Sequence, residues 1–306
     1  MKFYLAPMEG ITGYVYRNAY NKYFDGVDKY FTPFITPDQN RYLNKKEKKD
    51  VQPELNKGLY VVPQIMTNNA EYFTGLQKEL KELGYSEVNL NLGCPAATVV
   101  TKRKGAGLLA FPEELDKLLY SIFEKNVGKI SIKTRVGMSS YDEFDRLLDI
   151  FNKYEMEELI IHPRVREDFY KNTPCMETFR KALLKSKNRL VYNGDIHSVE
   201  DYKKFTDKFS EADAIMLGRG VLKNPTLISQ CKCMIINNDK EIIMKFMDEI
   251  LRGYYEYMGN QRNVLFRMKE LWLYLKEYFD NGDKYWKKIN KAKDFKEYSE
   301  IIAELI

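Results

Sequence analysis

Residues 190–220, LVYNGDIHSVEDYKKFTDKFSEADAIMLGRG, contain one copy of the pattern that decides the fold. Leu190–Ile196 and Ala214–Gly220 are strand-like runs, and Val199–Phe209 between them has the residue spacing of an amphipathic helix. Two neighbouring parallel strands need a long crossover connection, and a loop, a helix and a second loop provide it. This segment therefore predicts a strand–helix–strand unit with parallel strands.

The same unit recurs towards the N-terminus. Counting the two strands above, eight strand-like runs are present, and successive runs start 24 to 42 residues apart. The earlier six are Lys2–Met8, Lys29–Phe34, Leu59–Met66, Glu87–Gly93, Lys129–Val136 and Glu158–Arg164. Helical spacing also predicts helices at Ala70–Leu83, Pro112–Phe123 and Tyr141–Tyr154.

Eight such units predict an α/β fold, a (β/α)8 TIM barrel, which typically needs about 250 residues. An open, doubly wound sheet is the alternative, because alternation alone does not show closure. No G-x-G-x-x-G follows the first strand and no Walker-A sequence is present, which weakens the open-sheet alternative.

From Lys240 onward the strand pattern is lost. Apolar residues then recur at intervals of three and four, as in Ile243, Phe246 and Ile250, and a final helix is predicted near Asp294–Leu305. We expect two domains: a catalytic barrel over residues 1–236 and a small helical bundle over 237–306.

Composition restricts the class of protein. The chain has 306 residues, 44% hydrophobic and 30% charged, with a net charge of +5, which is typical of a globular protein and permits an acidic partner such as RNA. No apolar stretch approaches the ~20 residues of a membrane span, and no signal sequence is visible. Four cysteines do not make a disulfide framework, and the C-x-C pair Cys231 and Cys233 is a poor zinc motif. We expect a cytoplasmic protein without membrane contact or metal.

Polar, cationic and glycine residues stand where the predicted strands end. In a TIM barrel these ends meet at the active face, and buried polar groups there are costly unless they contact a ligand or one another. The residues are Pro7, Met8, Glu9, Gln64, Asn91, Cys94, Lys133, Arg135, His162, Arg164, Asn193, Gly194, Asp195, Gly218 and Arg219.

The last two strands predict a phosphate site. Asn193-Gly194-Asp195 and Gly218-Arg219 follow strands seven and eight, where barrel enzymes commonly bind phosphate through backbone N–H groups that glycine leaves uncovered. Arg219 adds a positive charge. Each segment alone is equally consistent with an ordinary tight turn; the pair favours phosphate.

Cys94 is the candidate for chemistry. It follows Asn91-Leu92-Gly93 and precedes Pro95, and Lys102, Arg103 and Lys104 are close in sequence. Nearby cations favour a thiolate, which suits a nucleophile, whereas a proton donor needs the thiol protonated. The alternative is a small buried apolar residue. His162 is a cofactor contact or a core histidine, while His197 and the other cysteines are interpreted as structural.

Seven motifs resemble one protein family. They are LAPMEGITGYVYR (5–17), VPQI (62–65), NLGCPAATVVTKRKGAGLL (91–109), IKTRVG (132–137), IIHPR (160–164), VYNGDI (191–196) and MLGRGVLKNP (216–225). In this order they resemble the tRNA-dihydrouridine synthases, flavin enzymes that reduce uridine in RNA. The resemblance covers essentially the whole chain, because that family also has a barrel followed by a helical RNA-binding domain.

The resemblance implies an FMN cofactor and NADPH as reductant. The cofactor-binding residues it implies are Pro7, Met8, Glu9, Gln64, Asn91, Lys133, His162, Asn193, Gly194, Asp195, Gly218 and Arg219. Cys94 is then the catalytic acid: hydride passes from flavin N5 to uracil C6, and Cys94 gives a proton to C5.

The resemblance also implies tRNA as the partner. The RNA-binding residues it suggests are Lys102, Arg135, Arg166, Tyr170, Arg262 and Lys269. Arg262, Lys269 and Lys276 repeat every seven residues, and a further basic group lies at Arg41, Lys45, Lys46, Lys48 and Lys49. On the sequence alone, each group is more often a solvated charged face than a binding site.

Three other functions remain open at this stage. The chain could be an FMN barrel acting on another RNA such as rRNA, one that reduces a small-molecule C=C bond, or a non-catalytic RNA-binding protein. The helical extension argues against a small substrate, and the set Asn91, Cys94, Lys133 and Asn193 argues against lost catalysis. No protein partner is implied, and we expect a monomer.

Overall fold

The barrel strands are all parallel in the computed structural model, which describes residues 1–234 and 239–305. The strand order is β3-β2-β1-β9-β8-β7-β6-β5-β4. The strands are β1 (Lys2–Leu5), β2 (Lys29–Phe31), β3 (Val61–Val62), β4 (Gln64–Ile65), β5 (Glu87–Leu92), β6 (Lys129–Arg135), β7 (Leu159–His162), β8 (Leu190–Tyr192) and β9 (Ala214–Leu217).

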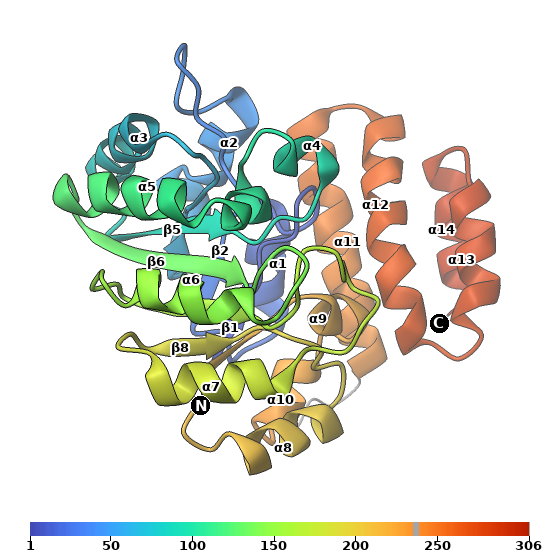
Figure 1. Cartoon of the computed structure of the whole chain (residues 1–306). Coiled ribbons are helices and arrows are strands. Elements are labelled where there is room, and N and C mark those ends of the chain that lie inside the picture. The colour runs from blue at the N-terminus through green and yellow to red at the C-terminus, as the bar shows by residue number, and fades with distance from the viewer. Residues whose placement is uncertain (235–238, 306) are drawn as a thin grey trace.

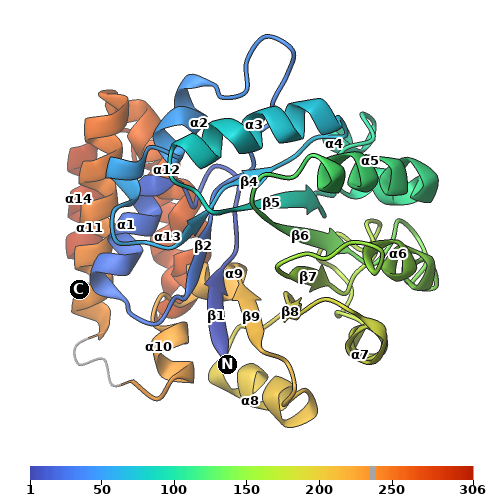
Figure 2. The ribbon, with the colours of Figure 1, turned by 90° about the vertical axis from the view of Figure 1, so that its left-hand side faces the viewer.

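The two outermost strands of this order are halves of one predicted strand. β3 pairs with β2 and β4 pairs with β5, and Pro63 separates them. Proline has no N–H to donate to a strand ladder, so the strand changes partner at this residue. The sheet therefore closes into the expected (β/α)8 barrel, and Figure 2 shows the strands gathered around a common axis.

Helices alternate with the strands around the outside of the barrel (Figure 1). They are α1 (Tyr14–Tyr23), α3 (Ala70–Glu82), α5 (Pro112–Glu124), α6 (Glu143–Phe151), α7 (Met176–Lys185) and α8 (Val199–Lys208). Shorter pieces are α2 (Lys45–Asp50), η1 (Pro53–Asn56), α4 (Ala97–Val100), η2 (Gly105–Ala110), α9 (Arg219–Lys223) and α10 (Leu227–Cys231). The four predicted helices of this region are confirmed, with ends within three residues of the prediction.

Local sequence explains where these helices begin. Asn69 caps α3 by accepting a hydrogen bond from Tyr72 N at 3.0 Å. Ser198 and Asp201 form a reciprocal capping box at the start of α8. The helices cover the outside of the barrel, while a separate apolar cluster that includes Tyr4, Phe31 and Met216 fills its interior.

The C-terminal part is helical, as the spacing from Lys240 onward predicts. It contains α11 (Asp239–Met258), α12 (Gln261–Leu275), η3 (Lys276–Tyr278), α13 (Gly282–Lys291) and α14 (Phe295–Ala303). The expected domain boundary between residues 236 and 237 lies outside the described residues. In the described ranges, no helix combines the length and apolarity required to cross a membrane.

These helices share a core with the barrel. Figures 1 and 2 both show α11 lying along α1. The Phe246 ring of α11 packs edge-on against Tyr16, Tyr20 and Phe24, with centroids 5.2 to 6.1 Å apart. A Cβ on Gly253 would be 2.8 Å from Val15, so glycine allows the two helices to approach closely. The contact between the helices and the barrel is therefore a packed apolar interface.

Candidate active site at the C-terminal mouth of the barrel

A cavity of about 180 Å³ opens where the barrel strands end. All residues expected to bind the cofactor line it, and so does Cys94: Pro7, Met8, Glu9, Gln64, Asn91, Cys94, Lys133, His162, Asn193, Gly194, Asp195, Gly218 and Arg219. Arg135 and Tyr170 line it as well. Phe34 and His197 are cavity residues that the sequence analysis missed, and His197 was interpreted as structural. Their signal was weak because Phe34 is an apolar residue at the end of a predicted strand, and His197 lies in the loop after one.

Asn91 fixes the position of the Cys94 loop. Its Oδ1 accepts hydrogen bonds from the N–H groups of Gly93 at 3.0 Å and Cys94 at 3.1 Å. A Cβ on Gly105, whose φ is +53°, would be 2.9 Å from Cβ of Cys94, and one on Gly107 would be 2.5 Å from the carbonyl oxygen of Val100. The glycines of the KGAGLL motif thus let the 3-10 helix η2 pack directly beneath the loop.

A chain of buried hydrogen bonds runs from Asn91 through the barrel interior. Asn91 Nδ2 donates to Gln64 Oε1 at 2.7 Å, and Gln64 Nε2 donates to Asn89 Oδ1 at 2.8 Å. Asn89 Nδ2 then donates to Ser131 Oγ at 3.0 Å, and Ser131 donates to Glu87 Oε1 at 2.9 Å. Each amide donates in the same direction, so the network fixes which atoms Gln64 and Asn91 present to the cavity.

The chain ends in a compensated charge cluster at the opposite end of the barrel. Lys29 Nζ is 2.9 Å from carboxylate oxygens of both Glu87 and Glu158. Burial lowers the pKa of Lys29, but the two carboxylates outweigh that effect and the pKa is raised. Tyr4 OH donates to Glu158 at 2.5 Å. The sequence places these residues at strand starts but gives no sign of their pairing.

At the mouth of the barrel, the buried cations Lys133 and Arg135 lie near each other instead of beside carboxylates. Burial, with a further contribution from Arg135, lowers the pKa of Lys133 to about 7. Burial also holds the pKa of His162 well below its usual value, and Arg135, Lys133 and Arg164 add to this. His162 is therefore neutral at physiological pH.

The tautomer of His162 follows from one contact. Nη1 of Arg164 lies 3.1 Å from Nε2 of His162. A guanidinium can only donate, so Nε2 accepts and the ring proton is on Nδ1. His162 thereby offers an N–H donor on its other nitrogen, beside cations that favour an electron-rich ligand.

Cys94 is protonated at neutral pH. Burial raises the pKa of its thiol, and this outweighs the lowering by the backbone N–H of Ala96 and by Lys133 and Arg135. Among the flanking cations, Arg103 is paired with Glu114 at 2.5 Å and lies over the Phe111 ring. The geometry therefore favours a proton donor over a thiolate nucleophile at this position.

The predicted phosphate end is built around Asp195. Its carboxylate accepts from both terminal nitrogens of Arg164, with 2.9 Å from Nη1 to Oδ1, and from Nη2 of Arg219 at 2.5 Å. Burial would raise the pKa of Asp195, but His197, Arg164 and Arg219 hold it well below its usual range. The carboxylate would repel a phosphate, so its side chain serves to hold the two arginines in place.

Asn193 joins the ends of the two glycine-bearing strands. Its Nδ2 donates to the carbonyl oxygen of Met216 at 2.8 Å. A Cβ at Gly194 would be 2.0 Å from the hydroxyl of Tyr192, and one at Gly220 would be 2.2 Å from the carbonyl of Ile196. Glycine is required at both positions, and it leaves the backbone there uncovered.

Three of the residues expected to bind RNA lie at the cavity rim. Arg135 is 1% exposed and donates to the carbonyl oxygens of Gly93, Val165 and Phe169 at 3.1, 2.8 and 2.7 Å. These bonds hold the loop after β7 in place, and Arg135 lines the cavity as well. Arg166 donates to the carbonyl of Pro95 at 3.2 Å. Tyr170 is 47% exposed.

The other expected RNA residues lie outside the cavity. Lys102 is exposed near α4, and Arg262 is exposed on α12. Lys269 Nζ donates to the carbonyl of Ala292 at the end of α13 at 2.7 Å, and Lys276 is paired with Asp283 at 2.7 Å. Of the three basic residues that repeat every seven positions, Lys269 and Lys276 therefore bind residues of other helices.

Comparison with known proteins identifies the same family that the motifs suggested. The family model described as dihydrouridine synthase matches residues 4–305. A probable tRNA-dihydrouridine synthase of Staphylococcus epidermidis is 30% identical over 234 residues, which is 73% of this chain and 69% of that protein. tRNA-dihydrouridine synthase B of Pasteurella multocida is 24% identical over 288 residues, 90% of this chain and 83% of that protein. A structure of morphinone reductase in complex with tetrahydroNAD has a TM-score of 0.48 at 12% identity, covering 77% of this chain and 88% of that one.

Proposed function

The chain belongs to the dihydrouridine synthase family, and from this membership and the cavity we propose that it is a flavin-dependent tRNA-dihydrouridine synthase. In this function it reduces the C5=C6 bond of a uridine in tRNA to give 5,6-dihydrouridine. The observation that carries the proposal is the arrangement of Cys94, Asn91 and Lys133 around one cavity. The protonated thiol of Cys94 would then face the uracil, while the amine of Lys133 would face the flavin ring.

The cavity residues fit FMN. A flavin has an electron-rich pyrimidine edge and a phosphate, and both are matched by cations in excess at the barrel mouth. Lys133 and the Nδ1–H of His162 would bind the ring edge, and Arg219 with the uncovered backbone of Gly194 and Gly218 would bind the phosphate. Gln64 and Asn91 would present the amide atoms that the buried hydrogen-bond chain fixes.

When bound, reduced FMN supplies the hydride that reaches C6 of the uracil, with NADPH as the source of electrons. Cys94 holds its proton in the folded protein and delivers it to C5. Asn91 positions the cysteine through the two backbone hydrogen bonds of its loop. The target uridine has to leave its base stack to reach the cavity.

We further propose that residues 237–306 form the RNA-binding domain and that the protein works as a cytoplasmic monomer with tRNA as its partner. A cavity lined at its rim by Tyr170, with Arg166 bonded to the carbonyl of the lining residue Pro95, suits an extruded base better than a free small molecule. The basic surfaces of α2 and α12 support an anionic polymer as substrate.

The test is a reoxidation experiment. The purified protein is reduced with NADPH without oxygen, unmodified tRNA is added, and flavin absorbance is followed. Reoxidation with dihydrouridine formed in the tRNA supports the proposal. If tRNA leaves the flavin reduced but rRNA or a small enone reoxidises it, the substrate is that molecule and not tRNA. A preparation without flavin would contradict the cofactor assignment.

A further inference from the structure

A second pocket of about 120 Å³ lies beside the barrel mouth, between the β1–α1 loop, α2 and the C-terminal helices. We name it the Asp50 pocket. The residues of its lining that carry the argument are Gly10, Gly13, Lys46, Asp50, Tyr257 and Arg267. None of them belongs to the proposed flavin site.

Asp50 is a buried carboxylate with unused hydrogen-bonding capacity. Its side chain is 7% exposed. Oδ1 accepts from the N–H of Tyr14 at 2.7 Å, and Nη1 of Arg17 is 3.8 Å from the same oxygen. In the described parts of the chain, no hydrogen bond reaches Oδ2. A buried carboxylate in this state favours a ligand that brings N–H donors.

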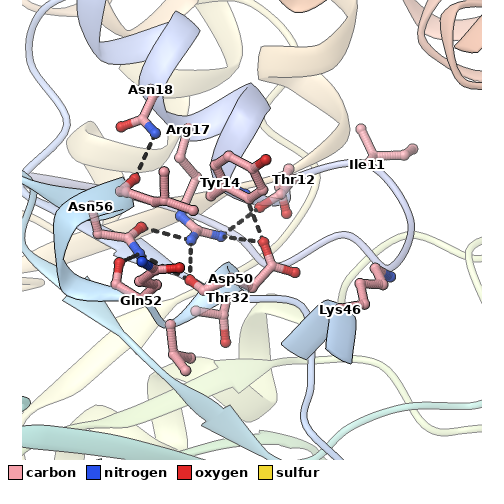
Figure 3. A network of polar contacts seen from close by, with 12 residues as sticks. Ile11, Thr12, Tyr14, Arg17, Asn18, Thr32, Lys46, Asp50, Gln52 and Asn56 are labelled. Atoms are coloured by element: carbon pink, nitrogen blue, oxygen red, sulfur yellow. Dashed lines mark hydrogen bonds and ion pairs between the residues drawn. The ribbon is translucent and has the colours of Figure 1, made fainter. Parts of the chain in front are cut away.

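Arg17 does not supply the missing donors, because its guanidinium is directed elsewhere. It donates to the carbonyl oxygens of Thr12 at 2.9 Å and Asp50 at 2.7 Å, and to Oδ1 of Asn56 at 2.8 Å. Figure 3 shows these contacts and shows the second carboxylate oxygen of Asp50 turned away from Arg17. Burial raises the pKa of Asp50 against the lowering by Arg17 and Tyr14 N–H.

Two glycines keep the pocket open. A Cβ at Gly13 would be 3.1 Å from Oδ1 and 3.7 Å from Oδ2 of Asp50, so both oxygens face the space that glycine leaves. Gly10 has a φ of +78°, and a Cβ there would be 2.9 Å from Nη1 of Arg267. The absence of a side chain at Gly13 leaves the Asp50 carboxylate open to the pocket. The absence of one at Gly10 allows the Arg267 guanidinium to lie close to the β1–α1 loop.

The surroundings of the pocket fit RNA. An adjoining hollow shares Lys46, Tyr257 and Arg267 with it and adds Lys45 and Lys49, together with Phe266, which is 59% exposed. Lys49 Nζ is 4.6 Å from the centre of the Tyr257 ring. Clustered cations with aromatic rings are the pattern that binds phosphates and stacks bases.

The pocket is also next to the proposed active site. Lys46 Nζ is 3.1 Å from Oε1 of Glu9, and Glu9 lines the barrel cavity. A single RNA strand can therefore present one base to the cavity and another to this pocket.

We propose that the Asp50 pocket binds a guanine base of the RNA substrate. The proposal rests on the proposed function, because it places the guanine in the same RNA as the target uridine. Guanine carries two neighbouring N–H donors, N1–H and the N2 amino group, which match the two oxygens of one carboxylate. Adenine, cytosine and uracil do not present such a pair on one edge. Tyr257 forms an aromatic wall, and the lysines of α2 with Arg267 lie beside it to bind the flanking phosphates.

The first experiment measures affinity of the flavin-loaded protein for an unmodified tRNA transcript, without reductant. Asp50→Asn replaces an acceptor oxygen by a donor. Tyr257→Leu removes the aromatic wall and leaves every hydrogen bond of Arg17 and Asp50 in place, since Tyr257 contacts only the ring of Tyr14 among these residues. We expect each to weaken binding about tenfold with unchanged flavin content. The matched control is Tyr255→Leu, because Tyr255 is on the same helix, is 50% exposed and does not line the pocket. Wild-type affinity in Tyr257→Leu would overturn the proposal, even if Asp50→Asn fails to fold.

The second experiment identifies the base. Transcripts carry inosine in place of one guanosine at a time, which removes only the N2 amino group. We expect one position to weaken binding to the wild-type protein several-fold and to have no further effect on Asp50→Asn. Absence of any sensitive position, or losses that simply add in the variant, would refute guanine recognition.

The two proposals can fail separately. One outcome is that an inosine substitution weakens binding to the wild type but not to Asp50→Asn, while the protein forms no dihydrouridine. This would contradict the proposed reaction and leave the pocket assignment intact. If dihydrouridine forms but no guanosine position depends on Asp50, the pocket assignment is contradicted and the proposed reaction stands.

Discussion

The two ends of the barrel treat buried charge in opposite ways. At the end where the strands begin, Lys29 is balanced by Glu87 and Glu158, with both distances at 2.9 Å. At the mouth, Lys133 and Arg135 face a neutral His162, and the pKa of Lys133 is lowered to about 7. Compensated buried charges keep their ordinary protonation, whereas an uncompensated excess of one sign lowers the pKa of a buried cation and favours an electron-rich ligand. We therefore distinguish a structural end of this barrel from the mouth, its proposed functional end.

The strongest test of the functional end is Cys94→Ala. We expect turnover to fall about 10² to 10⁴-fold, because the proton donor is absent, while flavin content stays unchanged. The measurement is single-turnover reoxidation of the reduced flavin by tRNA. Cys175→Ala, which alters another free thiol, should react at the wild-type rate. An unchanged rate for Cys94→Ala at neutral pH would rule out the acid role.

The structural end is tested by Lys29→Met. This change leaves two buried carboxylates without a counter-charge, and we expect the free energy of unfolding to fall by about 3 to 5 kcal/mol. Urea denaturation measures it. The control is Lys129→Met, whose partner Glu157 is 3.0 Å away at the surface, and which should cost about 0 to 1 kcal/mol. Equal losses of unfolding free energy in the two variants would show that the buried cluster stabilises the fold no more than a surface ion pair does.

Lys133→Met sharpens the comparison through its pH dependence. The pKa of Lys133 is about 7 in the folded protein against 10.5 ordinarily. Between these values the unfolded chain binds a proton that the folded one does not, so wild-type stability rises with pH across that window. In the absence of cofactor, the free energy of unfolding of the variant should exceed that of the wild type by about 4 kcal/mol at pH 7, and the gap should close towards pH 10. A gap that does not change with pH would disprove the assignment.

The smallest effect is expected away from the barrel, on α12. Arg262→Glu should weaken tRNA binding about two- to fivefold at low salt and less at high salt, because one exposed cation contributes a single phosphate contact. Lys269→Glu should lower stability as well, since Lys269 binds the end of α13. A salt-independent loss of affinity for Arg262→Glu would point to altered folding instead.

The sequence predicts the barrel well because periodicity and strand-end composition are local properties. Every expected cofactor residue lines one cavity, since strand ends necessarily meet once the sheet closes. Even the division of the third strand follows from a visible residue, Pro63.

What the sequence does not predict is which side chains pair. Asp195 binds Arg164 and Arg219, which are 31 and 24 residues away, and Arg135 is bound by carbonyls up to 42 residues away. These partnerships depend on the directions that side chains take in the closed barrel. The same reason explains Lys269, whose spacing suggested an exposed stripe while its amine caps a neighbouring helix.

The packing of Phe246 against Tyr16, Tyr20 and Phe24 has a consequence for synthesis of the chain. The first helix leaves the ribosome about 220 residues before the phenylalanine that covers it. At about 5 to 20 residues per second, that interval lasts on the order of tens of seconds. The nascent barrel therefore carries an uncovered aromatic surface until about four-fifths of the chain has been made, and the covering of that surface is a late event.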